Sequence, residues 1–320
     1  MNSLRGKRVL VTGAAGFIGS HLVRKLIEQG GQVIALVRPS SDLWRIQDVL
    51  GKIEIHHSDL SDISIDALKT KIKNVDIVYH LGAAGVDQSG RDAASIVRVN
   101  VIGTLFLLQL ARDLNVARFV YCGSCFEYGA GSRLREDAPL APVNEYAVSK
   151  LSAGMLTDMF FRKYGLATVY LRPFTVYGPF EDLRRLVSHV ICGVLDGHDI
   201  ELTGGKQTRD MIFVDDVVEG FLAAGIKPGI AGNTFNLSTG NEMSVKEIAL
   251  TIVELMGNRV KLLLGAQSYR EAEVWSLSGD PAKAKNMLVW AAKISLREGL
   301  KNTIQWFEKN RGKYPVYTAR

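Results

Sequence analysis

The sequence is poor in the residues that build metal and redox sites. Only three cysteines occur in 320 residues, Cys122, Cys125 and Cys192. The spacing Cys122-x-x-Cys125 is that of a redox pair or of half a zinc site, but no second cysteine pair or histidine cluster would complete a metal site. We therefore expect no metal, and we interpret the thiols as reduced and buried in a cytoplasmic protein.

Long apolar runs and blocks of one charge are also missing. Stretches such as Val101–Leu110 are interrupted by polar residues and look too short to cross a bilayer. The polar segment Met1–Arg8 leads straight into an expected strand, so we expect no signal peptide and no membrane association. The net charge of +6 is not gathered into a basic stripe, which argues against nucleic acid and suits a small anionic ligand such as a nucleoside diphosphate.

Apolar residues make up 47% of the chain and form short runs that alternate with helical patterns. Strands are expected at Lys7–Val11, Gln32–Val37, Lys52–His56, Asp76–His80, Ala117–Cys122 and Ala167–Leu171. Helices are expected between them at His21–Gln29, Asp62–Ile72, Ala93–Leu114 and Glu145–Tyr164. Because the strands lack an apolar–polar alternation, we predict an α/β fold with a Rossmann-like, doubly wound parallel sheet covered on both faces.

The strand–helix rhythm ends near residue 172. Beyond it, short strands mix with helices expected at about 182–195, 215–226, 244–256 and 297–308. We therefore predict a dinucleotide-binding domain over residues 1–172. Residues 173–320 are expected to form mainly a smaller, mixed α/β substrate-binding lobe above the carboxyl edge of the sheet, with some segments returning to that sheet.

A glycine-rich turn follows the first expected strand and opens a helix. Gly13 suits the tight turn, Gly16 lets a pyrophosphate pass close to the backbone, and Gly19 allows the helix to pack near the strand. The free N–H groups at the start of the helix, at Phe17 and Ile18, would meet the phosphates. This arrangement predicts dinucleotide binding.

The second strand gives a hint about which dinucleotide binds. It ends at Val37 and Arg38 without the acidic residue that would accept hydrogen bonds from the ribose 2′-OH of NAD. Arg38 could instead meet a 2′-phosphate, so we favour NADP and keep NAD open; alternatively, Arg38 only covers the adenine face. Asp59, after the third strand, could accept a hydrogen bond from the adenine amino group or cap a short helix.

A reactive set is expected at the carboxyl ends of later strands. Tyr146 and Lys150 lie four residues apart and so share one helix face. The Lys150 ammonium should lower the pKa of the Tyr146 phenol, with a nicotinamide cation adding to the effect, so that Tyr146 can exchange a proton with a carbonyl or alcohol oxygen. Ser124, at the end of the fifth strand, can polarise the same oxygen.

These motifs resemble, over nearly the whole chain, an extended short-chain dehydrogenase/reductase of the nucleotide-sugar epimerase/dehydratase kind. The matching segments are Thr12–Gly19, Ser58–Leu60, Tyr79–Ala84, Asn100–Thr104, Ser124–Gly129, Tyr146–Lys150, Leu171–Pro179, Arg209–Asp216, Phe235–Gly240, Gly279–Ala284 and Leu296–Leu300.

The resemblance implies a nicotinamide cofactor and a nucleoside-diphosphate sugar in the cleft between the lobes. It implies that Ser124, Tyr146 and Lys150 are catalytic, with Lys150 also holding the nicotinamide ribose. The remaining implied contacts are Leu60, Leu81, Ala83 and Asn100 for the cofactor, and Thr175, Arg209 and Arg270 for the substrate. Thr175 stands where many epimerases have Asn. A homodimer through the helices Ala93–Leu114 and Glu145–Tyr164 is also implied.

One departure from the family pattern bears on the reaction. The dehydratase branch has an Asp-Glu pair directly after the catalytic hydroxyl residue, where this chain has Cys125 and Phe126, so we do not expect a 4,6-dehydratase. Glu127 follows one residue later, and its side chain is expected to point elsewhere. We favour NADPH-dependent reduction of a 4-keto group on a nucleotide-linked (deoxy)hexose. The alternatives are an NAD-dependent 4-epimerase, an NADP-dependent reductase of a small carbonyl compound and a non-catalytic scaffold.

Overall fold

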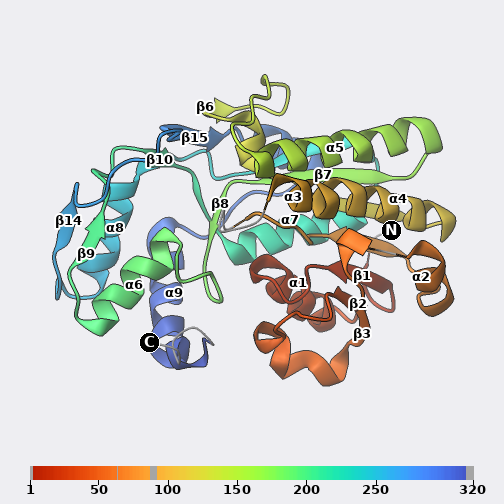
Figure 1. Ribbon diagram of the computed structural model, residues 1–320, viewed down its shortest axis with the longest axis horizontal. Helices are drawn as coiled ribbons and strands as arrows, with labels where there is room; N and C mark the ends of the chain where they lie inside the picture. The colour runs from red at the N-terminus through yellow and green to blue at the C-terminus, as the bar shows by residue number, and fades with distance from the viewer. Residues whose placement is uncertain (1–2, 63, 87–91, 315–320) are drawn as a thin grey trace.

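The computed structural model describes residues 3–62, 64–86 and 92–314. Its centre is a seven-stranded sheet of order β12-β7-β5-β4-β1-β2-β3, in which every pair of neighbours is parallel (Figure 1). The strands are β1 (Arg8–Thr12), β2 (Gln32–Val37), β3 (Glu54–His57), β4 (Ile77–His80), β5 (Arg118–Cys122), β7 (Thr168–Pro173) and β12 (Asn233–Leu237). The strand order reverses direction at β1 and β4, which is where ligands bind in sheets of this kind.

Helices cover both faces of the sheet. One face carries α1 (Phe17–Glu28) and α7 (Val214–Ile226); the other carries α2 (Ile65–Lys71), α3 (Ala93–Val97), α4 (Gly103–Asp113) and α5 (Glu145–Tyr164). Successive residues of β1 point to opposite faces, so Val9 and Val11 join one core and Leu10 the other. Both faces are therefore dry, which explains the missing apolar–polar alternation, and the predicted doubly wound fold is confirmed.

A smaller lobe follows at the carboxyl edge of the sheet, drawn at the left of Figure 1. Its third core gathers around α6 (Leu186–Asp196), α8 (Val245–Leu255) and α9 (Leu296–Asn310). Its strand pairs are β8 (Thr175–Tyr177) with β11 (Met211–Phe213), and β9 (Ile200–Leu202) with β14 (Leu262–Leu264). A four-stranded sheet has the order β13 (Met243–Ser244), β10 (Thr208–Arg209), β15 (Ser276–Gly279) and β6 (Gly131–Leu134).

Short helical turns complete the chain. They are η1 (Trp44–Lys52), η2 (Leu60–Asp62), the π-helical η3 (Arg98–Ile102), η4 (Cys125–Tyr128), the π-helical η5 (Ala284–Leu288) and η6 (Arg311–Lys313). The expected helix 62–72 is shorter, beginning at Ile65 where Ser64 accepts a hydrogen bond from the Ala67 N–H, and residue 63 lies outside the described part. The expected helix 182–195 begins only at Leu186.

The expectation that the interrupted apolar run Val101–Leu110 is too short to cross a bilayer needs a correction. Through the π turn, α3 and α4 form one helix, Ala93–Asp113, whose 21 residues and mean hydropathy of 1.7 would suffice to cross a membrane. Its most apolar window is 44% buried, and Asn100 in its middle is 2% exposed. A core helix passes the same test, and this one packs on α5 and the sheet.

Candidate active site

The glycine turn after β1 has the tight geometry that its sequence predicts. Gly13 has φ +69°, and a Cβ there would lie 2.7 Å from the backbone nitrogen of Gly82 in the loop after β4. A Cβ at Gly19 would overlap the carbonyl group of Gly13. These two positions therefore exclude side chains, because the turn, the start of α1 and the β4 loop touch through their backbones.

The start of α1 fits a pyrophosphate. Gly16 is its extended N-cap residue, no side chain of the described residues caps it, and the first turn holds no acidic residue. A Cβ at Gly16 would meet only the Gly13 carbonyl oxygen, at 3.0 Å, so the space above it is open. The N–H groups of Phe17 and Ile18, with the positive end of the helix dipole, are thus free to hold an anion.

The residues predicted to meet the adenosine lie at the ends of β2 and β3. Arg38 is exposed directly after β2, and only its backbone is fixed, by a 3.1 Å bond from its N–H to Ser41 Oγ. Asp59 Oδ1 accepts 2.8 Å hydrogen bonds from both the N–H and the hydroxyl of Ser61, which is the capping role left open above. Leu60 is buried, and its side chain would contact a Cβ at Gly82.

The loop after β4, which includes Leu81 and Ala83, is held from beneath by buried polar side chains. Thr12 Oγ1 accepts a hydrogen bond from Gly82 N–H at 3.0 Å and contacts His80 Nδ1 at 2.6 Å. Asn100 accepts from Ala84 N–H at 2.7 Å and donates to Ala84 O at 3.0 Å. Asn100 therefore shapes the cofactor loop through Ala84, while its predicted direct contact with the cofactor stays a prediction.

Ser124, Tyr146 and Lys150 come together at the carboxyl edge of the sheet. Ser124 is buried two residues after β5, and its side chain lies close enough to Tyr146, in the first turn of α5, to act on the pKa of that phenol. Asn144 caps that helix by accepting from Ala147 N–H at 2.8 Å. Lys150, 2% exposed, places its ammonium 4.5 Å from the centre of the Tyr121 ring, a cation–π contact.

The electrostatics of Tyr146 differ from the expectation. Burial raises the pKa of its phenol, whereas the neighbouring Ser124 side chain and the charge of Arg185 oppose that rise. Burial also lowers the pKa of Lys150. The expected lowering of the Tyr146 pKa is therefore wrong for the protein alone, because desolvation of the phenolate is the largest effect and Lys150 is not among the groups that shift this pKa. Tyr146 carries its proton until a ligand changes this balance.

Two residues near this site were missed in the sequence. Arg185, the N-cap residue of α6, is exposed and donates to the Val86 carbonyl oxygen at 2.8 Å, close enough for its charge to act on Tyr146. The Glu127 side chain was expected to point elsewhere. It is buried and accepts a hydrogen bond from Ser124 N–H, in a network directly behind Ser124. No local motif marks Arg185, whereas the charged residue Glu127 inside an apolar stretch was a visible signal.

The cysteines are free and buried, as interpreted from the sequence. Burial raises the pKa of Cys122 to about 11 and that of Cys125 to about 12, so both are neutral thiols at pH 7. No group of three or more metal-ligating side chains occurs among the described residues.

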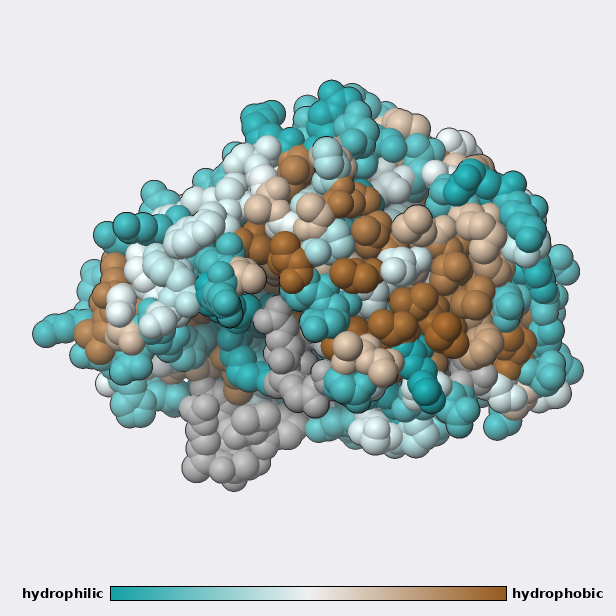
Figure 2. Space-filling view, turned by 45° about the horizontal axis from the view of Figure 1, so that its top comes forward, coloured by the Kyte–Doolittle hydropathy of each residue, from teal (hydrophilic) through white to brown (hydrophobic). Residues whose placement is uncertain are grey.

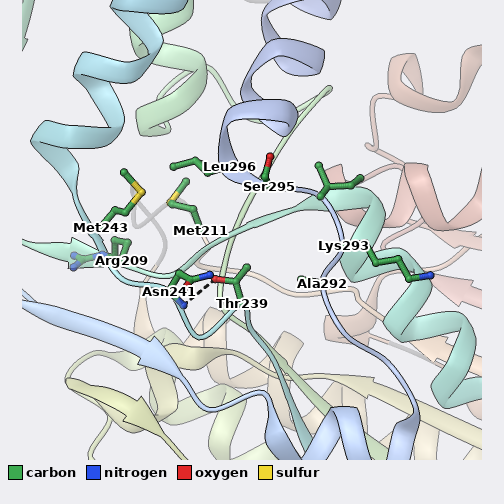
Figure 3. Close-up of a pocket in the computed structure, with 10 residues that line it drawn as sticks. Arg209, Met211, Thr239, Asn241, Met243, Ala292, Lys293, Ser295 and Leu296 are labelled. Atoms are coloured by element: carbon green, nitrogen blue, oxygen red, sulfur yellow. Dashed lines mark hydrogen bonds between the residues drawn. The ribbon is translucent and has the colours of Figure 1, made fainter.

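The predicted substrate residues lie in the smaller lobe but do not all converge. Thr175 pairs with Met211 across β8 and β11, next to Arg209. Arg209 donates to Glu273 Oε1 at 2.9 Å and to the carbonyl oxygens of Thr208 and Val274. It lines a cavity of about 190 Å³ with the loop before β13 and the start of α9 (Figure 3). Arg270 is exposed and is not among the residues that line this cavity.

Comparisons with known proteins agree with this geometry. Residues 9–238 match the NAD dependent epimerase/dehydratase family. The chain belongs to that family. A UDP-glucose 4-epimerase of Mycolicibacterium smegmatis is 32% identical over 94% of this chain and 98% of its own length.

Solved structures of epimerase/dehydratase family members share the whole fold. The UDP-glucose 4-epimerase of Thermotoga maritima, solved with UDP-glucose, superposes with a TM-score of 0.88 at 30% identity, covering 95% of this chain and 99% of that one. The dTDP-glucose 4,6-dehydratase DesIV of Streptomyces venezuelae, solved with NAD bound, gives 0.86 at 29% identity, covering 97% and 99%. The predicted family is confirmed, and this chain is an NAD(P)-dependent enzyme of the short-chain dehydrogenase/reductase type.

Proposed function

We propose that this epimerase/dehydratase family member is an NAD-dependent 4-epimerase of a nucleoside-diphosphate hexose. The observation that carries the proposal is that Ser124 lies beside Tyr146 and is followed in the chain by Cys125 and Phe126. A thiol that stays neutral at pH 7 and an apolar ring cannot remove and return the protons of a dehydration. Likeness to 4-epimerases also favours this reaction over the 4-keto reduction preferred from the sequence.

The chemistry of the chain's own residues follows from their placement. Tyr146 lies beside Ser124, so once bound ligands have shifted it to the phenolate it can take the proton of a sugar hydroxyl that approaches Ser124 and later return it to the same oxygen. Ser124 hydrogen-bonds that oxygen and stabilises negative charge on it. The Lys150 ammonium stabilises the Tyr146 phenolate while it lasts. The bound nicotinamide supplies the hydride chemistry at the sugar carbon.

NAD is the proposed cofactor, held at the start of α1 and by the loop after β4. The preference for NADP rested on Arg38 and on the missing acid at the end of β2. The exposed Arg38 side chain keeps one second candidate in place, a 4-keto reductase using NADPH. The epimerase should retain tightly bound NAD, whereas the reductase should bind exchangeable NADP. The nucleotide content of the purified protein therefore discriminates between them.

We further propose that the enzyme is a homodimer through α3–η3–α4 and α5. Several large apolar side chains on these helices are exposed, namely Val97, Ile102, Val148 and Met155. Figure 2 shows apolar side chains gathered over this part of the molecule. Patches of this kind on stable proteins commonly mark interfaces. Light scattering should give twice the chain mass at micromolar concentration. The variant Met155→Glu should give a mass closer to that of one chain. A monomeric wild-type protein would contradict the proposal.

The main experiment combines cofactor content with a substrate panel. Protein denatured after gel filtration should release NAD rather than NADP. With UDP- and dTDP-linked glucose, galactose and glucuronate, the proposal predicts that one pair of 4-epimers interconverts to a fixed ratio without added cofactor. Release of NADP, together with oxidation of added NADPH by a 4-keto sugar nucleotide and no interconversion, would favour the reductase instead.

A further inference from the structure

A fully buried carboxylate lies directly behind the catalytic serine. Glu127 is 0% exposed and belongs to η4, the turn that begins after Ser124. Its Oε1 accepts the backbone N–H of Ser124 at 2.8 Å, while Ser124 Oγ accepts the N–H of Phe126 at 3.2 Å. Such a reciprocal cap fixes the backbone of Ser124 from both sides. The direction in which the Ser124 hydroxyl is presented therefore depends on Glu127.

The second oxygen of Glu127 is held by side chains of β7. Arg172 Nε donates to Oε2 at 2.8 Å, and the Tyr170 hydroxyl donates to the same oxygen. Arg172 also donates to the Tyr128 hydroxyl at 2.9 Å. Tyr170 and Arg172 are two residues apart on a strand and so point to the same face of the sheet. Both oxygens of the buried carboxylate are thus engaged by charged or polar donors.

The backbone leaves room for this group at two glycines. A Cβ at Gly123 would overlap the Tyr170 ring and come within 2.7 Å of Glu127 Oε1. A Cβ at Gly154, on α5, would overlap the other edge of the same ring. Tyr170 is therefore slotted between the segment that carries Ser124 and the helix that carries Tyr146 and Lys150, with its hydroxyl on Glu127.

Glu127 also lies close to Lys150: the Lys150 ammonium sits over the Tyr121 ring, and that ring packs 5.2 Å from the ring of Tyr170, whose hydroxyl donates to Glu127. The titratable groups that face the Lys150 ammonium are Tyr121 and Cys122 on β5, His80 on β4, and Glu127 on η4. Cys122 is a neutral thiol at pH 7, and burial lowers the pKa of His80 to about 3, so His80 is neutral as well. Tyr146, on the same helix as Lys150, keeps its proton, so the carboxylate among the groups around Lys150 is that of Glu127, which forms a 2.8 Å ion pair with Arg172.

We propose that Glu127 is a positioning residue for the reaction: it orients Ser124 through the backbone N–H and keeps Lys150 charged, while Arg172 and Tyr170 hold its carboxylate. This inference rests on the proposed function of the site. Stability alone is a weak reason for such a pair, because buried ion pairs are often replaceable by apolar residues without loss. The pair lies where charge and direction matter for proton transfer, which gives it a reason to be kept.

The test removes both charges together. Glu127→Gln alone leaves Arg172 buried and unpaired and is expected to be strongly destabilised. The double variant Glu127→Gln with Arg172→Met keeps an oxygen for the Ser124 N–H and should fold. Lysine ε-carbons labelled with ¹³C report the titration of Lys150, assigned by the signal lost in Lys150→Met. We expect Lys150 in the double variant to titrate at least about one pH unit lower, because burial is then no longer opposed by the Glu127 carboxylate.

Activity should follow that titration. Since Lys150 must keep its proton, the alkaline limb of kcat should move to lower pH by the same amount, with KM changed less than about twofold. Replacing Glu127 by Leu in the same Arg172→Met background also removes the acceptor for Ser124 N–H. This variant should lose at least about tenfold more in the plateau kcat. A Lys150 titration and an alkaline limb that both stay at wild-type values in a folded double variant would overturn the inference.

Arg118→Met is the matched control. Arg118 is another buried arginine, and it donates to the carbonyl oxygens of Ala224 and Lys227. It lies at the start of β5, the end of the strand that is far from Ser124. We expect a lower Tm with no change in the Lys150 titration. Because the NMR measurement needs no substrate, it tests the link between Glu127 and Lys150 even if no sugar nucleotide is converted. In that case the proposed function fails while the electrostatic inference stands or falls by itself.

Discussion

The catalytic edge and the smaller lobe each contain a deeply buried carboxylate, and the two are satisfied in different ways. Glu127 is paired with Arg172, a side chain on a central strand of the large sheet. Asp210, between β10 and β11, accepts four hydrogen bonds, from Thr239 N–H and hydroxyl and from the N–H groups of Gly240 and Gly279. The first carboxylate keeps a charge pair beside the reacting groups, while the second ties loops together through their backbones.

This difference extends to the elements themselves. Tyr146 and Lys150 share one 20-residue helix, and Ser124 follows a strand with neighbours on both sides in the seven-stranded sheet. Thr175 and Arg209 lie on strands of three and two residues, and Arg270 lies outside any helix or strand. Long elements therefore hold the residues proposed for proton transfer, whereas short strands and loops hold those predicted to contact the substrate, where a change of sequence disturbs the fold least.

The largest effect should come from the catalytic edge. Tyr146→Phe removes the hydroxyl that is proposed to exchange a proton with the sugar hydroxyl next to Ser124. Turnover should therefore fall by at least ~10²-fold. Steady-state kinetics and calorimetric binding of NAD check this, since cofactor affinity should stay nearly unchanged. Turnover at the wild-type level would exclude Tyr146 from the reaction.

The buried His80 side chain, on β4, makes the stability of the catalytic edge depend on pH. Burial lowers its pKa to about 3, whereas the unfolded value is near 6.5. Between these values the unfolded chain binds the extra proton, so stability is present above pH 6.5 and is lost as the pH falls. Urea unfolding should show a loss of about 2 kcal/mol between pH 7 and pH 5 that is absent in His80→Gln. Equal losses in both proteins would show that His80 is not buried as a neutral group.

Arg209 tests the smaller lobe. If it meets the substrate diphosphate, Arg209→Met should raise KM about tenfold with little change in kcat, as expected for a lost charged hydrogen bond. Glu273→Gln is the control, because it breaks the 2.9 Å ion pair but leaves the guanidinium in place. A lower Tm with unchanged KM in Arg209→Met would instead make Arg209 a purely structural residue.

The smallest effect is expected at the cysteines. Cys122 and Cys125 are buried thiols with pKa values of about 11 and 12. A thiol-specific reagent at pH 8 should therefore modify neither residue in the native protein within minutes, and both in urea. Rapid native labelling of Cys122 would mean that the catalytic edge opens far more readily than the smaller lobe.

The strand–helix rhythm and the glycine turn were enough to predict the sheet, and the Tyr146–Lys150 spacing placed these two residues on one helix; their catalytic role stays a prediction. These are local patterns: a 3.6-residue period, a turn that excludes side chains, and residues four apart on a helix. Helix starts were less predictable, as at Leu186, because capping there depends on neighbours. The bilayer estimate failed because the apolar run Val101–Leu110 is only part of a longer helix.

The order of residues along the chain determined the parallel sheet, the glycine turn and the choice of candidate proton-transfer residues. Only the tertiary structure decided that Glu127 lies behind Ser124 with Arg172, that Arg185 acts on Tyr146 from another lobe, and that burial raises the Tyr146 pKa. The reason is that propensity and spacing act between near neighbours in sequence. Burial and charge interactions depend instead on distances in space, which here bring together residues 45 and 39 positions apart.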